Sequence, residues 1–476
     1  MTKILVVISA DIYVRNYLRT DALSSLQKHY DVDIIADTGL ALANEVSQNP
    51  SFIGFFSLAP DTEKKHRLLF NLLMWRHRKK SRTFLYRWLR NSQWHLIKRQ
   101  GSLLEIALSA ASWIVKASRN PHGLRIPVLA SGPLFPLISA VLRRSLPVNP
   151  DLEKFVTTND YDMIVFPSAA FDSVSVDLSR LGRQHHVPTL CLIDNWDNLT
   201  SKTVFWKKPD FLGVWGEQAR QQAMSVHGFS AEQIHLLGTP RFDSYFAARE
   251  EPEEQRHYKF PYVLFVGSAM PFDEIGTLHA LEAILESDPA IPPNLKIVYR
   301  PHPWQQKRNS PAVFDSRNFS RVDLDLQMRA AFDAGLEPEK TDPAFQPELG
   351  YYPSLLRGAE AVIGPLTTML FESALCLRPV IALSYFDGYH PNTGRRYFVH
   401  FEGMEKVPGF AFCNSASELH GQLKSALDHE TILAEVSDTQ TSYFLFRDHL
   451  SYPERLAQVS ALVLQSEKKA SRTSKP

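Results

Sequence analysis

The sequence has few of the features that mark specialised protein classes. Its three cysteines, Cys191, Cys376 and Cys413, are far apart, lie in apolar surroundings and lack the spacing of metal ligands. This scarcity argues against a disulfide scaffold or a cysteine zinc site and favours a reducing compartment. The formal net charge is only +1, so overall charge gives no reason to expect a nucleic-acid partner. A Gly-x-Ser-x-Gly motif, a P-loop and a clustered metal-ligand set are missing as well.

Long hydrophobic runs are also missing. The longest uncharged stretch, Ile126 to Leu142, is shorter than the roughly 20 residues that span a bilayer, and it contains three prolines. Near the N-terminus, Asp11 and Arg15 interrupt the apolar run Ile4–Ala10, so we interpret that run as a strand and not as a signal peptide. We therefore expect a cytoplasmic protein, with peripheral attachment to the inner face of the cell membrane left open.

The composition is that of a folded protein with a substantial core. Hydrophobic residues make up 44% and charged residues 22% of the 476 residues, enough chain for two or three domains. Short β-rich apolar runs alternate with helical patterns, which predicts parallel sheets built from βαβ units. The expected strands are Lys3–Ser9, Val32–Ala36, Met163–Pro167, Thr189–Ile193, Phe211–Trp215, Ile234–Leu237, Tyr262–Gly267, Leu295–Tyr299, Ala361–Ile363 and Val380–Leu383.

These segments predict an α/β protein of two Rossmann-like domains. The first covers residues 1–249 and carries a helical insertion at about 60–145. A charged, turn-prone connector at 250–258 separates it from the second domain, 259–430. Residues 431–476 are expected to form terminal helices and a disordered tail.

The insertion is basic and aromatic. Between Glu63 and Glu105 there are 12 Lys and Arg residues and no carboxylate, interleaved with Phe70, Trp75, Phe84, Trp88 and Trp94. Residues 64–99 are therefore a candidate for contact with an anionic membrane surface. The alternative is a solvated basic face over a local core. Nucleic acid is not expected, because no nucleic-acid-binding module is recognisable.

Three loops of the second domain follow strands whose carboxyl ends should meet at one sheet edge, where ligands of open α/β sheets bind. Gly267 and Ser268 end the first strand, where small residues let a ligand approach the backbone. Arg300 and His302 follow the next strand in a Pro-rich loop and could contact phosphate oxygens. These loops are candidates for the binding of a nucleotide donor.

The third loop, Gly364–Thr368, opens a helix. Exposed N–H groups at a helix start, with the hydroxyls of Thr367 and Thr368, suit a diphosphate. Glu372 lies about one turn later and could accept hydrogen bonds from a ribose diol. The alternative makes one threonine an ordinary N-cap and Glu372 a solvent-facing helix residue.

In this order, Gly267-Ser268, then Arg300-Pro301-His302-Pro303, then Gly364-Pro365-Leu366-Thr367-Thr368 with Glu372, the motifs resemble the donor domain of GT-B glycosyltransferases. Within that fold they are most similar to bacterial surface-polysaccharide enzymes, the CDP-glycerol glycerophosphotransferases and the capsule or lipopolysaccharide Kdo transferases. The resemblance covers roughly residues 262–385 and implies two domains facing across a cleft. It also implies that His302, Thr367 and Thr368 bind the nucleotide phosphates and that Glu372 binds the ribose. Pro365-Leu366 departs from the small polar residues of many relatives.

The first domain is expected to bind the acceptor. The polar run Asp194-Asn195-Trp196-Asp197-Asn198-Leu199-Thr200-Ser201-Lys202 follows a strand, and in it Trp196 could stack on a sugar while Asn195, Asn198 and Lys202 contact hydroxyls. Asp194, Asp197 or Asp11 could orient or deprotonate the acceptor. The alternatives are an Asx-rich structural loop and a helix cap at Asp11. The turn Gly238–Asp243 is expected to shape the hinge, with Arg241 a further candidate for the donor phosphate.

The sequence therefore predicts a glycosyltransferase without a metal or other cofactor, using a nucleotide-sugar or CDP-polyol donor as substrate. His302, Arg300 and the helix start would stabilise the departing phosphate. The acceptor would be a surface polysaccharide, a lipopolysaccharide or a lipid-linked glycan. Three alternatives remain open: a glycerophosphotransferase, a nucleotide-sugar 2-epimerase, and a non-catalytic protein on the membrane face.

Overall fold

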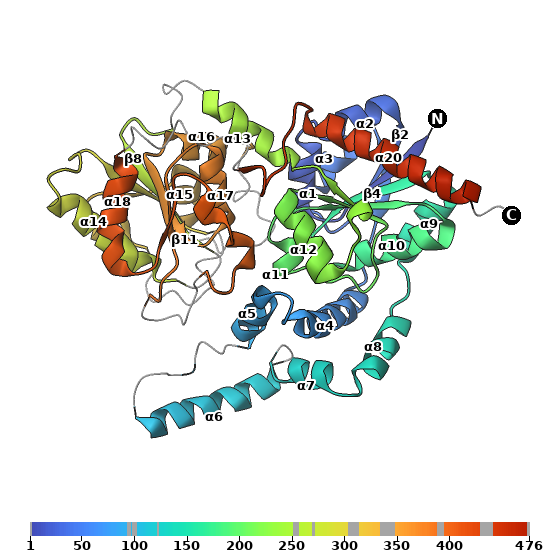
Figure 1. Cartoon of the computed structure of the whole chain (residues 1–476), viewed down its shortest axis with the longest axis horizontal. Helices are drawn as coiled ribbons and strands as arrows, with labels where there is room; N and C mark the ends of the chain where they lie inside the picture. The colour runs from blue at the N-terminus through green and yellow to red at the C-terminus, as the bar shows by residue number, and fades with distance from the viewer. Residues whose placement is uncertain are drawn as a thin grey trace. The chain divides into compact units, whose positions relative to one another are not determined.

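The computed structural model describes residues 2–92, 97, 102–120, 123–250, 257–268, 272–302, 314–333, 348–387, 395–428 and 441–473. The chain forms two compact units (Figure 1). The first unit contains Met1–Pro240 together with Ser442–Pro476, and the second contains Arg241–Thr441. The connector expected at 250–258 thus falls inside the second unit, and most of it, 251–256, lies outside the described residues.

The first unit is built on a seven-stranded parallel sheet of order β3-β2-β1-β4-β5-β6-β7. Six of these strands were expected from the sequence, and β3 was not. β3 is an edge strand with Ile53 42% and Phe55 37% exposed, so it lacks the buried apolar run that marks the others. The strands are β1 (Lys3–Ile8), β2 (Asp31–Asp37), β3 (Phe52–Phe56), β4 (Met163–Ser168), β5 (Thr189–Ile193), β6 (Phe211–Val214) and β7 (Ile234–Leu236).

Helices cover both faces of this sheet, which explains why its central strands are apolar at every position. On β1, Ile4, Val6 and Ile8 pack into one core cluster, while Leu5 and Val7 pack into another. The first cluster includes residues of α2 (Ser24–His29) and α20 (Tyr452–Thr473), and the second includes residues of α9 (Pro150–Thr158), α10 (Ser173–His185) and α12 (Glu217–His227). Shorter helices are α1 (Asp11–Tyr13), α3 (Ala43–Ser47) and α11 (Asn198–Ser201).

The last helix differs from expectation. The sequence predicts a disordered tail, but α20 continues to Thr473. Its side chains Tyr452, Leu456 and Val463 are buried against the first sheet. Figure 1 shows this red helix beside α2, which comes from the opposite end of the chain.

Between β3 and β4 the chain forms a helical insertion with a core of its own. Its helices are α4 (Pro60–His77), α5 (Arg82–Asn91), α6 (Leu103–Arg119), α7 (Arg125–Ser131) and α8 (Phe135–Arg144). Phe70, Phe84, Ile126 and Phe135 are buried in this core, together with Val176 of the parent unit. The basic helical insertion predicted in the first domain is therefore present.

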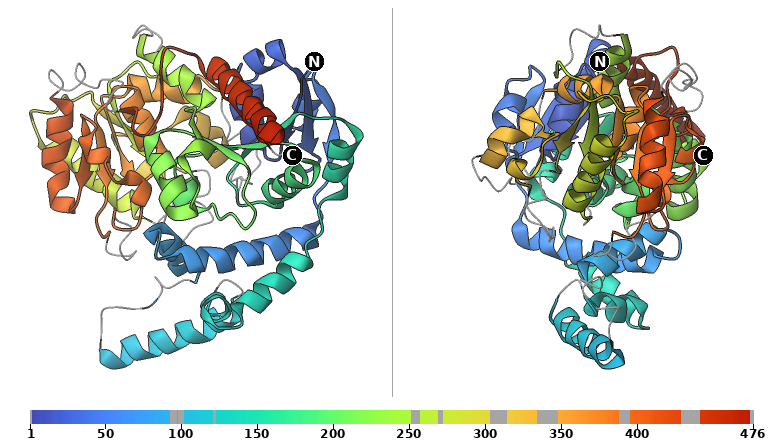
Figure 2. Two further views of the ribbon diagram at one scale, coloured as in Figure 1. Left: turned by 45° about the vertical axis from the view of Figure 1, so that its right-hand side comes forward. Right: turned by 90° about the vertical axis from the view of Figure 1, so that its left-hand side faces the viewer.

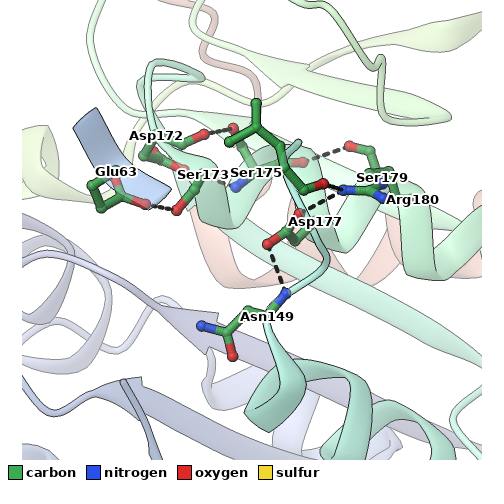
Figure 3. A network of polar contacts seen from close by, with 9 residues as sticks. Glu63, Asn149, Asp172, Ser173, Ser175, Asp177, Ser179 and Arg180 are labelled. Atoms are coloured by element: carbon green, nitrogen blue, oxygen red, sulfur yellow. Dashed lines mark hydrogen bonds and ion pairs between the residues drawn. The ribbon is translucent and has the colours of Figure 1, made fainter. Parts of the chain in front are cut away.

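A polar network holds the start of the insertion to the parent sheet (Figure 3). Glu63 of α4 accepts a hydrogen bond from the Ser173 hydroxyl at the start of α10. Asp172 caps the same helix by accepting from the Ser175 amide at 2.7 Å and from the Ser168 hydroxyl at 2.7 Å. Beside it, burial raises the pKa of the Asp177 carboxyl to about 7. The hydrogen bond between the half-buried Glu63 and Ser173 thus joins the base of the insertion to α10.

The second unit has a six-stranded parallel sheet of order β10-β9-β8-β11-β12-β13. Its strands are β8 (Tyr262–Val266), β9 (Lys296–Arg300), β10 (Val322–Leu324), β11 (Ala361–Pro365), β12 (Val380–Leu383) and β13 (Phe410–Cys413). Its helices are α13 (Asp243–Ala247), α14 (Glu274–Ser287), α15 (Leu326–Asp333), α16 (Tyr351–Gly358), α17 (Thr368–Leu375) and α18 (Leu419–Leu427). The short strands β10 and β13 lie at the two sheet edges and were not expected from the sequence.

Candidate functional site

The three predicted donor loops lie side by side at the carboxyl edge of the second sheet. Strands β8, β9 and β11 are hydrogen-bonded neighbours, so their loops leave the sheet together. The Gly267 amide donates to the Arg300 carbonyl at 2.8 Å, and the Ser268 hydroxyl donates to the Leu366 carbonyl at 3.3 Å. A Cβ at Gly267 would stand 2.7 Å from the His302 amide nitrogen, so glycine is needed for this close packing.

Arg300 lies beneath this edge and not on its surface. It is 7% exposed, and its Nη2 donates to the Tyr352 hydroxyl at 2.7 Å while its guanidinium lies 5.0 Å from the centre of that ring. Among the described residues its Nε has no hydrogen-bond partner, and neither has Oδ2 of the buried Asp325. The direct phosphate contact expected of Arg300 is therefore not available in this conformation. Its positive charge lies beneath the loop and raises the electrostatic potential there.

Of the two loop residues that the structure describes after β9, His302 is the more exposed. Its backbone follows the buried Pro301, and its side chain is half-buried. The following residues, 303–313, lie outside the described residues and include Pro303 of the motif. The structure therefore places His302 at the predicted edge of the sheet, next to Gly267.

A buried acid beside these loops was not predicted from the sequence to be part of the site. Glu274, the first residue of α14, accepts from the Ser268 amide at 2.9 Å and from the Tyr299 hydroxyl at 2.7 Å. Burial raises the pKa of the Glu274 carboxyl to about 7, although these two hydrogen bonds act in the opposite direction. In the sequence Asp273-Glu274 is an ordinary acidic pair. Only its position between two site loops distinguishes it.

The start of α17 has the form expected of an anion site. Thr367 is the N-cap residue with extended backbone, but its side chain makes no capping hydrogen bond. Thr367 and Thr368 are both half-buried. Thr367 therefore occupies the N-cap position without capping the helix through its side chain, and the remaining N–H groups of a helix start suit an anion.

Glu372 is neither solvent-facing nor open to a ribose. It is 5% exposed, and its two carboxylate oxygens accept hydrogen bonds from Arg241 and from the Tyr245 hydroxyl, the latter at 2.6 Å. A ribose diol could reach this carboxylate only after one of these partners moves away. The same ion pair occupies Arg241, the further candidate for the donor phosphate.

In the first unit the structure connects two predicted acceptor regions. Asn16, in the π-helical turn Val14–Leu18 after β1, donates its side-chain amide to Asp194 after β5 at 2.9 Å. Asp11 accepts from the Leu42 amide at 2.9 Å, so it holds a neighbouring loop. Asp194 and Asp11 are each 8% exposed. π-helical turns of this kind are frequent at functional sites.

Trp196 does not have the position that sugar stacking requires. It is 2% exposed and meets Phe444 edge-on, with ring centroids 6.1 Å apart. Asn198 is also buried, and Asp197 accepts from the Ser201 hydroxyl at 2.6 Å. In this polar run the Asn195 side chain is half-buried and accepts from the Trp196 amide, while Lys202 keeps 44% of its side chain exposed. Most of the run is therefore a structural Asx-rich turn.

The insertion contacts that run directly. The Ser81 hydroxyl donates to the Thr200 carbonyl at 2.7 Å, and Arg87 Nη1 donates to the Ser201 carbonyl at 3.1 Å. Burial lowers the pKa of the Arg87 guanidinium to about 10. Arg87 also lines a small, partly open pocket, which lies among α4, α5 and α7 and not at either sheet edge. Its other lining residues are Asn71, Met74, Trp75, Phe84, Trp88, Asn91 and Ile126.

No group of three His, Cys, Asp or Glu side chains within the described ranges is placed to hold a metal ion. The groups collected at the edge of the second sheet are instead the hydroxyls and N–H groups at the start of α17, the His302 imidazole, the buried Arg300 guanidinium and the buried acid Glu274. Apart from Glu274, these groups carry donors or positive charge. Such a set suits an anionic ligand.

Comparison with known proteins supports the fold. No protein-family model and no curated protein matches the chain. Among solved structures, the UDP-GlcNAc 2-epimerase of Methanocaldococcus jannaschii is similar, with a TM-score of 0.50 and 10% identity over 97% of this chain and 100% of that one. The corresponding enzyme of Rickettsia bellii (TM-score 0.49, 12% identity, 100% and 99% covered) and Acinetobacter baumannii MurG (0.41, 9%, 96% and 99%) are also similar.

The first of these likenesses extends over nearly the whole chain and confirms the predicted fold class, two Rossmann-like α/β domains of the GT-B type. At this identity it speaks for the fold alone. The narrower resemblance to CDP-glycerol and Kdo transferases finds no support in these comparisons.

Proposed function

We propose that this protein is a glycosyltransferase that binds a nucleotide-sugar donor at the carboxyl edge of its second sheet. The diphosphate would lie against the start of α17, bound by backbone N–H groups and by the hydroxyls of Thr367 and Thr368. His302 would contact the same phosphates from the neighbouring loop. Arg300 contributes buried positive charge, which stabilises the negative charge that develops on the departing phosphate.

One observation carries this proposal: three loops from adjacent parallel strands meet around a helix start that its N-cap side chain, Thr367, does not cap. Helix N-termini at the edge of parallel sheets are established positions for diphosphates, because the N–H groups and the helix dipole both favour an anion.

The acceptor would bind the first unit. Asp194 is the preferred candidate to orient or deprotonate an acceptor hydroxyl, since Asn16 holds its carboxylate at the end of β5. Asp11 and Asp197 are the other candidates, and their carboxylates likewise accept hydrogen bonds, from the Leu42 amide and the Ser201 hydroxyl respectively. The acceptor class that we propose is a glycan or a lipid-linked glycan. The insertion is hydrogen-bonded to the loop that follows Asp194 and thus lies next to the proposed acceptor residue.

A nucleotide-sugar 2-epimerase is the second candidate, because a solved structure of that name shares the fold along nearly the whole chain. An epimerase acts on the sugar of the nucleotide-sugar itself and needs no acceptor, so it would leave the insertion without a role in the reaction. Polyol-phosphate transfer from a CDP donor would use the same phosphate site and is separated from glycosyl transfer by the nucleotide that binds.

The test is a thermal-shift and calorimetric titration with UDP, CDP, CMP and GDP. A specific nucleotide at about 100 times its dissociation constant should stabilise the protein by roughly 2.7 kcal/mol. Thr367→Val and Thr368→Val should weaken that binding, while Thr157→Val on α9, in the other unit, should not. UDP-GlcNAc incubated alone then separates the candidates, because its conversion to the 2-epimer without an acceptor would establish the epimerase. Failure of every nucleotide to bind would refute both enzymes.

A further inference from the structure

The insertion presents an apolar stripe on α6 that is exposed to solvent. Leu103, Leu104, Leu108, Ile114 and Val115 recur at helical spacing and are 87%, 69%, 62%, 51% and 51% exposed. Residues three, four, seven and eleven positions apart share one face of a helix. Only Trp113 and Ala117 of this helix are buried, so its apolar stripe lies away from the contacts that attach it.

The next two helices continue this pattern. Leu134, Leu137 and Val141, at the start and along α8, are 65%, 63% and 56% exposed, and Val128 of α7 is 70% exposed. Within the described residues no single helix is long and apolar enough to cross a membrane. Taken together, α7 and α8 are long and apolar enough, but the chain bends by 102° between them. Nine of the sixteen large hydrophobic side chains found exposed in the described ranges lie between Leu103 and Val141.

The sequence around these stripes is almost entirely basic in its charged residues. From Lys64 to Val148 the sequence contains 17 Lys and Arg residues and a single carboxylate, Glu105. Glu105 is engaged in a capping box with Ser102 at the start of α6. Basic residues stand at the ends of both amphipathic helices, Lys116 and Arg119 on α6 and Arg143 and Arg144 on α8. The surface that binds these helices should therefore be both apolar and anionic.

Of the aromatic residues between Glu63 and Glu105, Phe70 and Phe84 are buried in the core of the insertion, while Trp75 and Trp88 are half-buried. Trp75 donates to the Ser131 hydroxyl at 2.7 Å, Trp88 donates to the Gly123 carbonyl at 3.2 Å, and the two rings meet edge-on at 4.7 Å. These two half-buried side chains thus connect α4 and α5 to α7 and to the turn before it, and a membrane contact by residues 64–99 stays a prediction. Trp94 lies outside the described residues. In Figure 2, α6 extends beyond α4 and α5, away from the sheet of the first unit.

We infer that α6, α7 and α8 bind the surface of an anionic lipid bilayer. Their apolar side chains enter the boundary between headgroups and acyl chains, and the flanking Arg and Lys residues contact lipid phosphates. This surface lies in the first unit and does not require the proposed nucleotide site. It would bring the insertion, which is bonded to the loop after Asp194, to the lipid surface.

The experiment is co-sedimentation of the full chain with vesicles of phosphatidylcholine alone or mixed with phosphatidylglycerol. The variant Leu104→Gln/Leu108→Gln/Val115→Gln should bind the mixed vesicles at least about tenfold more weakly, since burying even one such side chain is worth about a factor of ten. Arg143→Gln/Arg144→Gln should lose most of the preference for the anionic vesicles, roughly tenfold in affinity. Leu462→Gln, at a side chain 50% exposed on α20, is the matched control and should bind as the wild type does.

Circular dichroism and light scattering accompany each variant. Unchanged helix content with lost vesicle binding supports the inference. It is overturned if the triple variant binds vesicles as the wild type does. It is equally overturned if the wild type ignores vesicles and forms a dimer that the triple variant dissociates, because a second copy then covers the stripe. Thr368→Val should bind vesicles normally, so a failure of the nucleotide proposal remains distinguishable from a failure here.

Discussion

Arg241 and Glu372 form a buried ion pair inside the second unit, although 131 positions separate them in the sequence. Their side chains are 11% and 6% exposed, and Tyr245 completes the set by donating to the second carboxylate oxygen. The pair ties the start of α13 to the helix that opens the candidate phosphate site. Glu372 thus positions α17, and any direct contact with substrate would compete with that task.

Replacing Arg241 should therefore lower the stability of the protein, and any loss of activity should follow from that. Arg241→Met leaves a buried carboxylate without its cation and should destabilise the protein by about 3 kcal/mol. Tyr245→Phe removes one hydrogen bond and should cost about 1 kcal/mol. Urea unfolding followed by circular dichroism measures both. In the double variant Arg241→Met/Glu372→Gln the loss should be smaller than the sum of the single losses. A ribose role for Glu372 would instead appear as weaker nucleotide binding at unchanged stability.

Gly267→Ala should disturb the candidate site with little change elsewhere. Its Cβ would stand 2.7 Å from both the His302 amide nitrogen and the Glu274 carboxylate, so the His302 loop must move. We expect nucleotide binding to weaken, as measured by calorimetry. Gly421→Ala in α18 is the matched control, because nothing lies within 4 Å of its Cβ. That control should gain about 0.5–1 kcal/mol of stability and bind nucleotide normally.

The stability of the second unit should depend on the protonation of Glu274. Its folded pKa of about 7 lies above the ordinary value of 4.5, so the folded state binds the proton more tightly. The resulting stabilisation is complete below pH 4.5 and is lost as the pH rises to about 7, by up to about 1.4 kcal/mol for each pH unit. Glu274→Gln should remove this slope. The difference in unfolding free energy between wild type and variant, followed from pH 5 to pH 8, should shift in favour of the variant.

Trp196→Ala should act as a core mutation. The ring is buried against Phe444, so its removal leaves a cavity and should cost about 3–5 kcal/mol. Trp196→Phe should recover much of that loss. If the ring instead bound a sugar, Trp196→Ala would leave thermal unfolding unchanged and reduce only acceptor binding.

The sequence was sufficient to predict the central strands of both sheets, because parallel strands buried on both faces appear as continuous apolar runs such as Leu5 to Ile8. It missed three of the four edge strands, β3, β10 and β13, although it predicted the edge strand β7. β3 alternates exposed Ile53 and Phe55 with less exposed positions, and β10 has three residues, so neither gives a buried run.

At the site, spacing alone identified the loops but not the state of their side chains. The positions of Gly267, His302 and Thr367 follow from strand ends, which a sequence reveals. The burial of Arg300 under Tyr352, the pairing of Glu372 with Arg241 and the burial of Trp196 against Phe444 depend on partners that lie 52, more than 100 and more than 200 positions away. Local patterns contain no information about such partners, and the same is true of Glu274, whose significance comes from Tyr299 and Ser268.

The return of the last helix to the first sheet sets an order for folding during synthesis. The Phe446 amide bonds to the Trp215 carbonyl at 2.6 Å, and Arg455 donates to the Leu237 carbonyl at 2.9 Å, so the closing segment is joined to strands made long before it. The second unit is one continuous stretch and has all its strands once residue 413 has emerged from the ribosome. One face of the first sheet, by contrast, is not covered by α20 until translation is nearly finished. A chain stopped at Thr441 would lack α20, so Ile4, Leu26 and their apolar neighbours would be exposed to solvent. Such exposed apolar surface promotes chaperone binding and aggregation.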